Sequence, residues 1–258
     1  MVKERKMLEA AANIVSVGKR GFSSNELKVI AIIAMTIDHL AWLFFPGYST
    51  DGIALLMHII GRLTAPIMIF FIVEGYFKTK NIKKYILRMF VFALISHFAY
   101  ALMFDKNFMP LQNTIFDQTS VMWAFALGLT ALTISKSDNP KLKQWHKTAL
   151  VGICLLAAFP ADWSTPAAAS ILYMGQNRDD FKKQTRWFML FMTMYAIVYA
   201  LFLDPLYGLL QMCVALAIPL WCMYNGERGK WKGMKWFFYV YYPLHLTILG
   251  LIRIFYMP

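Results

Sequence analysis

The stretch ELKVIAIIAMTIDHLAWLFF, from Glu26 to Phe45, decides the fold because it is long and apolar enough to cross a lipid bilayer. Asp38 and His39 interrupt this run near the depth of the bilayer centre. An ionisable side chain at that depth costs about 2.5–3.5 kcal/mol on insertion scales, and such residues usually mark a site. We therefore expect one of the two to orient the helix and the other to take part in chemistry.

Apolar runs of this kind recur along the chain. Of its 258 residues 59% are hydrophobic and 16% are charged, whereas soluble domains carry about 25% charged residues. This composition predicts an all-α polytopic integral membrane protein. The net charge of +12 is divided among short clusters between the apolar runs, which argues against nucleic-acid binding. The three cysteines lie inside apolar runs without metal-ligand spacing, so no metal site is expected.

The runs predict nine membrane spans in a single transmembrane domain, residues 27–258. Residues 1–26 are basic and mildly amphipathic, which predicts a cytoplasmic segment whose plainest interpretation is a helix lying on the membrane surface. The fifth and sixth spans are short and joined by the turn PADW, residues 160–163, so a re-entrant hairpin is the alternative there. The predicted spans are approximately 27–45, 53–77, 85–104, 120–135, 146–160, 163–176, 187–203, 206–224 and 235–256.

The basic residues predict the orientation of these spans. The N-terminal segment and the even-numbered connections hold 23 of the 26 lysines and arginines. Of the other three, Lys106 lies in an odd-numbered connection, Arg253 lies near the C-terminus, and Arg62 lies inside the second span. Because cytoplasmic loops carry the excess of positive charge, this alternation places the N-terminus in the cytoplasm and the C-terminus outside.

Helical rise predicts that four spans bring ionisable residues to one layer. His39, His97 and His245 lie about 15–18 Å from the cytoplasmic ends of their spans, and Arg62 lies about 14 Å from the outer end of its span, in a hydrocarbon core about 30 Å thick. Pro66 and Pro243 add possible helix breaks beside this layer. Simpler interpretations remain open: a membrane histidine can be a helix–helix hydrogen-bond partner, and Asp38 can neutralise Arg62.

A second polar group is predicted at the cytoplasmic end of the second and third spans. Glu74 precedes a basic cluster there and can pair with Lys78 at i+4. The cluster could hold the phosphates of a nucleotide-bearing donor, although short inside loops are also basic merely to fix topology. Its members are Lys78, Lys80, Lys83, Lys84 and Arg88.

Several motifs in this order resemble the TraX family. They are IDH in the first span, GR and EG in the second, YGLLQM at residues 207–212, and YPLHL at residues 242–246. The resemblance covers most of the chain and is densest over residues 27–96. It implies an inner-membrane protein related to transmembrane acyltransferases, whose acyl donor is cytoplasmic acyl-CoA and whose embedded histidine is essential. That role falls on His39, and Arg62, Tyr242 and His245 lie in matching motifs.

The expected activity is transfer of an acetyl or other acyl group from acetyl-CoA, as co-substrate, to an amine or hydroxyl. The acceptor implied is a peptide such as a pilin N-terminus, or a glycan. His39, oriented by Asp38 or His245, would act as the base, a task that suits histidine because the ordinary pKa of its side chain lies near the working pH. Arg62 would anchor an anionic group. The alternatives are a proton-coupled transporter or channel, which also uses such layers, and a non-catalytic component of pilus or envelope assembly.

Overall fold

The fold is known from a computed structural model, which describes residues 21–109 and 118–256. Within these residues the chain is helical, and its only β-type pairings are two isolated bridges, Phe22 with Tyr224 and Thr119 with Ala161. The predicted segment 1–26 lies mostly outside the described residues. The elements are α2 (Ser24–Phe44), α3 (Gly52–Gly61), α4 (Thr64–Lys78), α5 (Ile82–Phe104), α6 (Val121–Ser135), α7 (Gln144–Ala157), α8 (Ser164–Gln176), α9 (Phe181–Phe202), α10 (Pro205–Gln211), the 3₁₀ helix η1 (Met212–Leu216), α11 (Ala217–Cys222) and α12 (Met234–Tyr256).

The all-α polytopic prediction is confirmed, because six helical segments are long and apolar enough to cross a membrane. These segments are α2, α3 with α4, α5, α9, α10 through α11, and α12. Helices α6, α7 and α8 have 15, 14 and 13 residues. At 1.5 Å of rise per residue each is about 20–22 Å long, shorter than the hydrocarbon core. Each predicted span therefore contains helix, but the count of nine full spans and the orientation stay predictions.

The second predicted span is broken one turn before its proline. Helix α3 ends at Gly61, and α4 begins at Thr64. Pro66 explains the position of the break, because a proline ring clashes with the carbonyl of the residue four positions earlier, which is Arg62. The break thus places Arg62 at a helix end inside the bundle. Pro243, by contrast, lies within an uninterrupted α12.

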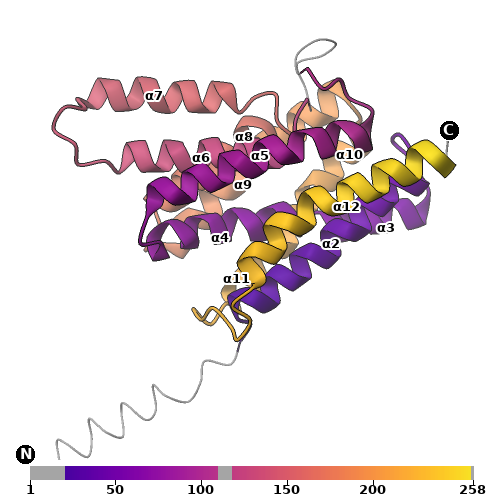
Figure 1. Ribbon diagram of the computed structural model, residues 1–258, viewed down its shortest axis with the longest axis horizontal. Helices are drawn as coiled ribbons and strands as arrows, with labels where there is room; N and C mark the ends of the chain where they lie inside the picture. The colour runs from indigo at the N-terminus through magenta and orange to yellow at the C-terminus, as the bar shows by residue number, and fades with distance from the viewer. Residues whose placement is uncertain (1–20, 110–117, 257–258) are drawn as a thin grey trace, which may run out of the picture.

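Close helix packing builds the centre of the bundle around α6, which contacts α5, α7 and α8 (Figure 1). At the crossing of α6 and α8, a Cβ added to Gly128 would lie 2.9 Å from backbone atoms of Ala168. Small residues permit such close approach of membrane helices. Helix α12 packs along α5 and α2, which brings the C-terminal span beside the first one.

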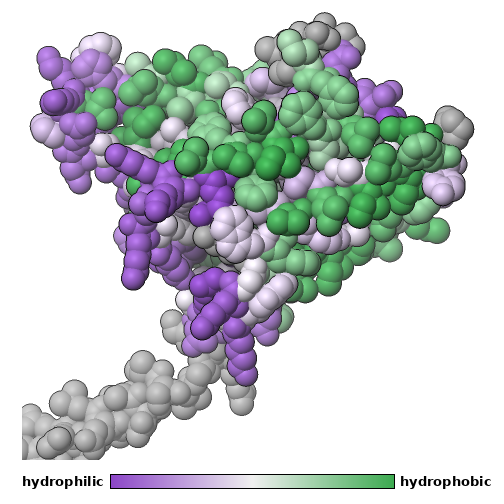
Figure 2. Space-filling view, viewed as in Figure 1, coloured by the Kyte–Doolittle hydropathy of each residue, from purple (hydrophilic) through white to green (hydrophobic). Residues whose placement is uncertain are grey.

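The basic segments predicted to share one side meet at one end of the bundle. Lys28, Lys78, Arg88 and Arg228 line one cavity there, and hydrophilic residues gather mainly around the connections at this end (Figure 2). At the other end Arg253 pairs with Asp105 at 3.2 Å. Cations from three of the five basic segments thus share one end of the bundle, and the orientation of that end in the membrane stays a prediction.

Candidate active site

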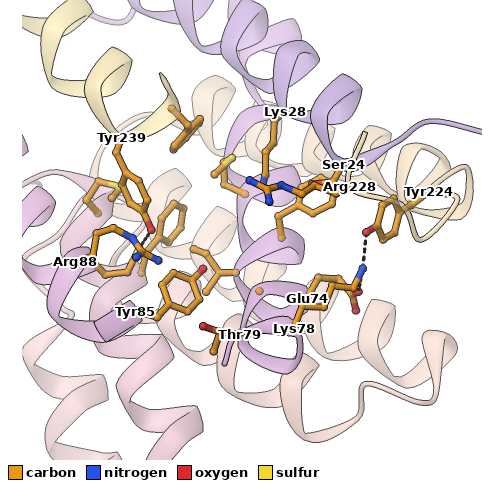
Figure 3. A pocket seen from close by; sticks show the side chains of 18 of the residues that line it. Ser24, Lys28, Glu74, Lys78, Thr79, Tyr85, Arg88, Tyr224, Arg228 and Tyr239 are labelled. Carbon is orange, nitrogen blue, oxygen red and sulfur yellow. Dashed lines mark hydrogen bonds and ion pairs between the residues drawn. The ribbon is translucent and has the colours of Figure 1, made fainter. Parts of the chain in front are cut away.

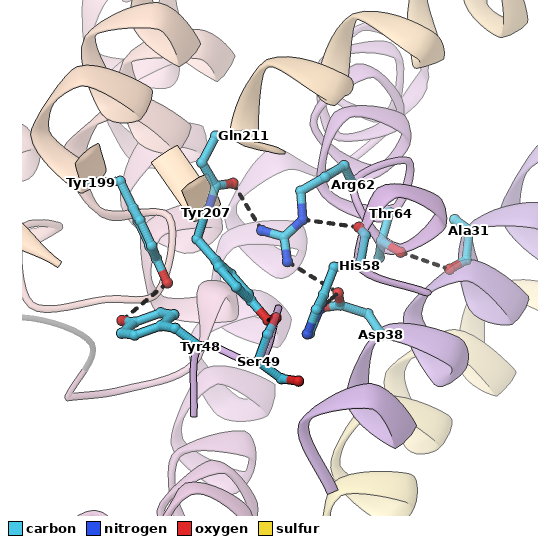
Figure 4. A network of polar contacts seen from close by, with 10 residues as sticks. All are labelled: Ala31, Asp38, Tyr48, Ser49, His58, Arg62, Thr64, Tyr199, Tyr207 and Gln211. Atoms are coloured by element: carbon cyan, nitrogen blue, oxygen red, sulfur yellow. Dashed lines mark hydrogen bonds and ion pairs between the residues drawn. The ribbon is translucent and has the colours of Figure 1, made fainter. Parts of the chain in front are cut away.

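Asp38 and Arg62 meet in a buried network between α2 and the break after α3 (Figure 4). Asp38 Oδ1 accepts from Arg62 Nη2 at 3.0 Å and from His58 Nδ1 at 2.9 Å. Arg62 Nη1 donates to Gln211 Oε1 at 2.8 Å, and Arg62 Nε donates to the carbonyl of His58 at 3.3 Å. Both charges are thus paired and hydrogen-bonded, which a buried ion pair requires. These contacts favour mutual neutralisation over the expected anion-anchoring role of Arg62.

A pair of histidines joins α2 to α12. His39 Nδ1 lies 2.7 Å from His245 Nε2, and His245 Nδ1 lies 2.9 Å from the carbonyl oxygen of Tyr241. A carbonyl can only accept, so His245 Nδ1 carries the proton in that bond. In neutral His245 the Nε2 is then the acceptor, and His39 Nδ1 must donate to it. This assignment leaves the lone pair of His39 on Nε2, the atom that a general base needs.

The orienting partner of His39 is therefore His245, one of the two possibilities that the sequence left open. Asp38, its neighbour in the chain, contacts His58 and Arg62 instead, because adjacent helical residues point about 100° apart. Asp38 and His39, although adjacent in the chain, consequently belong to two separate hydrogen-bond networks.

Both Asp38 and His39 line a small cavity of about 40 Å³ in the interior of the bundle. Tyr242 of α12 lines it as well, together with Asp162 and Trp163 from the turn before α8. A buried water needs about 10–15 Å³ of such space. The cavity thus has room for a few non-hydrogen atoms beside His39.

A larger cavity of about 510 Å³ opens at the basic end of the bundle (Figure 3). Lys28, Arg88 and Arg228 point toward it from α2, α5 and the loop before α12. The guanidinium of Arg88 lies 5.2 Å from the ring centre of Tyr85 and 5.3 Å from that of Tyr239. Stacking of this kind holds a guanidinium in a fixed plane.

The two cavities adjoin. Four side chains line both of them: Met68, Met122, Phe125 and Phe238. All four are apolar, and methionine side chains are flexible enough to adapt to an inserted group. A wall of buried apolar side chains is therefore all that lies between the large cavity at the basic end and the small cavity that His39 lines.

Other residues predicted for the site lie apart from His39 or are engaged elsewhere. His97 Nδ1 lies 3.1 Å from Thr119 Oγ1, and its Nε2 lies 2.7 Å from the carbonyl oxygen of Phe108. His97 therefore ties α5 to the connection between α5 and α6, rather than to another helix as the helix–helix interpretation predicted. Lys83 and Lys84 are exposed and do not line the large cavity.

Glu74 and Lys78 line the large cavity but are already paired with each other. Lys78 Nζ lies 3.2 Å from Glu74 Oε2 and donates to Tyr224 Oη at 2.7 Å. Glu74 Oε1 also accepts from Arg178 Nε at 3.0 Å. The expected pairing at i+4 is thus present, and these two residues close one side of the mouth.

Sequence reasoning missed residues that converge from distant segments. Gln211 lies in the YGLLQM motif, but nothing in the sequence gave it a partner 149 positions away. Lys28 and Arg228 enter the sequence argument only as topology signals, although both line the large cavity. The sequence signal that these two residues lie close together was their shared position at the predicted cytoplasmic ends of spans.

Gly61 is required for the approach of α3 to Asp38. A Cβ at this position would lie 2.3 Å from both Cβ and Oδ1 of Asp38. We expect Gly61→Ala to lower the free energy of unfolding by about 1–3 kcal/mol through overpacking. Thermal unfolding in detergent would measure the loss. Gly52→Ala is the matched control, because nothing lies within 4 Å of its added Cβ; equal stability of both variants would contradict the packing.

Comparison with known proteins identifies the family. The sequence profile described as "TraX protein" matches residues 23–253. The chain belongs to the TraX family. This TraX-family protein is also 30% identical over 235 residues to "Probable fimbrial assembly protein FimC, serogroup H1" of Dichelobacter nodosus, covering 88% of this chain and 94% of the relative. No solved structure matches the chain.

Proposed function

We propose that this TraX-family protein is a transmembrane acyltransferase of the inner membrane. It moves an acetyl or other acyl group from cytoplasmic acyl-CoA to an amine or hydroxyl acceptor. The observation that carries this proposal is the pair of adjoining cavities, one with cations at its mouth and one with His39 and Asp38 in its wall. Phosphates of the donor bind at the mouth through charge-assisted hydrogen bonds, and the thioester reaches the small cavity past Met68 and Met122.

The groups present suit acyl transfer. His39 Nε2 accepts the proton of the acceptor amine or hydroxyl while that nucleophile attacks the thioester carbonyl. The new C–N or C–O bond forms, the C–S bond breaks, and the proton passes from His39 to the departing thiolate, which gives the free thiol. His245 holds the ring of His39 and stabilises the imidazolium through their hydrogen bond. Apolar surroundings keep competing water from the thioester.

The acceptor is proposed from the relative. Its name assigns it to fimbrial assembly, which supports a peptide of a surface filament as acceptor, with a glycan hydroxyl as the alternative. The same name also supports a second candidate function, a non-catalytic role in fimbrial assembly. That role requires neither a donor cavity nor a basic nitrogen on His39, so donor binding distinguishes the two.

The test is binding of radiolabelled acetyl-CoA to the purified protein in detergent, with free CoA as competitor. We expect saturable binding that CoA displaces in the wild type and in His39→Ala, because His39 lies beyond the cavity that receives the phosphates. Absence of binding by protein that elutes as a folded species would overturn the acyltransferase and favour the assembly role.

A further inference from the structure

A third cavity, of about 380 Å³, lies between α7, α8 and α9, away from the donor path. Helix α9 lines it with one stripe at helical spacing: Phe191, Met194, Val198 and Phe202. Thr165 and Ala169 of α8 form part of its floor. We refer to this cavity as the apolar groove.

The polarity of the apolar groove matches a hydrocarbon ligand. No charged side chain lines it within the part of the chain that the structure describes. Two hydroxyls in its lining are turned to backbone carbonyls: Ser164 Oγ donates to Phe159 at 2.8 Å and Thr165 Oγ1 donates to Leu155 at 2.8 Å. An occupant that needed hydrogen bonds would find these groups already used.

The apolar groove is continuous with the surface that faces the bilayer. Met194, Val198 and Phe202 line it and are also 53%, 41% and 69% exposed on α9. Helix α9 is one of the six long apolar segments, so its exposed face meets lipid. The groove is therefore surrounded by lipid chains. If it were empty, the side chains of its walls would lose van der Waals contacts.

One layer of aromatic rings separates the apolar groove from the small cavity. Tyr195 lines the groove and stacks on Trp163 with ring centres 5.6 Å apart and an interplanar angle of 20°. Trp163 lines the small cavity and lies under the guanidinium of Arg62 at 5.4 Å. The backbone of Trp163 has φ +60°, and Ser164 has φ +46°. Bulky residues rarely adopt this region, and such strain persists only where surrounding structure holds it.

We propose that the apolar groove binds one hydrocarbon chain of a bilayer phospholipid, which packs against the outer side of the Tyr195–Trp163 wall. The lipid would support this strained wall from the membrane side. The inference goes beyond acyl transfer and does not depend on the identity of the donor or acceptor.

The test uses a phospholipid with a photoreactive group on its acyl chain, added to the purified protein in vesicles. We expect peptides of α8 and α9 that line the groove to be labelled more strongly than the exposed face of α5. Val198→Trp fills the groove from its open side and should lower the labelling of α8 about fivefold or more. Ile197→Trp is the matched control, since Ile197 is 53% exposed on the same helix but does not line the groove.

Three results would overturn the proposal. The first is labelling of the groove peptides that is no stronger than labelling of α5. The second is equal labelling of α8 in the Val198→Trp and Ile197→Trp variants. The third is cross-linking of a photoreactive residue at position 198 to a protein rather than to lipid in native membranes. Because the readout is labelling, it is separate from acetyl-CoA binding. The groove and the acyltransferase can therefore fail independently.

Discussion

His39→Ala is expected to lower acyl transfer by about 10²–10⁴-fold, the usual contribution of a general base. The reason is the hydrogen-bond chain from the Tyr241 carbonyl through His245 to His39, which leaves the free lone pair on His39 Nε2. Alanine removes that nitrogen without touching the basic mouth, so the affinity for acetyl-CoA should change little. Initial rates with radiolabelled acetyl-CoA, beside equilibrium binding, measure both quantities.

Variants of two other histidines serve as controls for this result. His97→Ala removes a buried histidine that contacts Thr119 outside the site, and it should retain transfer in the folded fraction. His245→Gln keeps an amide oxygen able to accept from His39 Nδ1 and should retain more activity than His245→Ala. Undiminished transfer by His39→Ala would sink the assignment and move attention to His58, whose Nδ1 is held by Asp38 at 2.9 Å.

The sequence predicted the helices well because a long apolar run leaves few alternatives inside a bilayer. Residues 24–44 and 82–104 are helical where long apolar runs predicted spans at 27–45 and 85–104. The break after Gly61 was anticipated through Pro66, but its place at Arg62 and Leu63 depends on where the proline ring meets the preceding turn. Spans shorter than the hydrocarbon core, such as α8, cannot be counted from hydropathy alone.

The sequence predicted how deep each site residue lies in the membrane, but not toward which neighbouring helix its side chain points. Helical rise gave a common level to His39, Arg62, His97 and His245, which is one coordinate out of three. Rotation of each helix about its axis then decides partners: His39 meets His245, whereas His97 faces Thr119. The rotation of each helix is set by packing against side chains of several other helices. The sequence of one span therefore does not determine it.

Helix rotation and loop position also explain which cations line the mouth of the large cavity. The sequence predicted a single cluster after the second span, but Lys83 and Lys84 are exposed away from the cavity. Lys28 and Arg228 come instead from segments about 200 positions apart, held together because Asn25 N donates to the Arg228 carbonyl at 3.1 Å. Because these cations come from two helices and a loop, no local sequence motif marks the mouth of the cavity.

Removing two cations at the mouth is expected to have the second large effect. Lys28→Ala combined with Arg88→Ala should weaken acetyl-CoA binding by about 100-fold or more, because each hydrogen bond to a charged group contributes about 1.5–3 kcal/mol. Among the described residues neither cation has a carboxylate partner, whereas Lys78 is paired with Glu74. Lys28 and Arg88 are therefore two of the charges available to an incoming phosphate.

The matched control for this pair is Lys83→Ala combined with Lys84→Ala. It removes the same formal charge from the same end of the bundle, but from exposed side chains that do not line the cavity. If the cations act through direct contact, the control should retain nearly full affinity. If they act only through the overall field, both double variants should weaken binding alike, and raising the salt concentration should erase the difference from wild type. Equal losses would contradict the cavity as the donor site, and a loss confined to the first pair would assign the phosphates to Lys28 and Arg88.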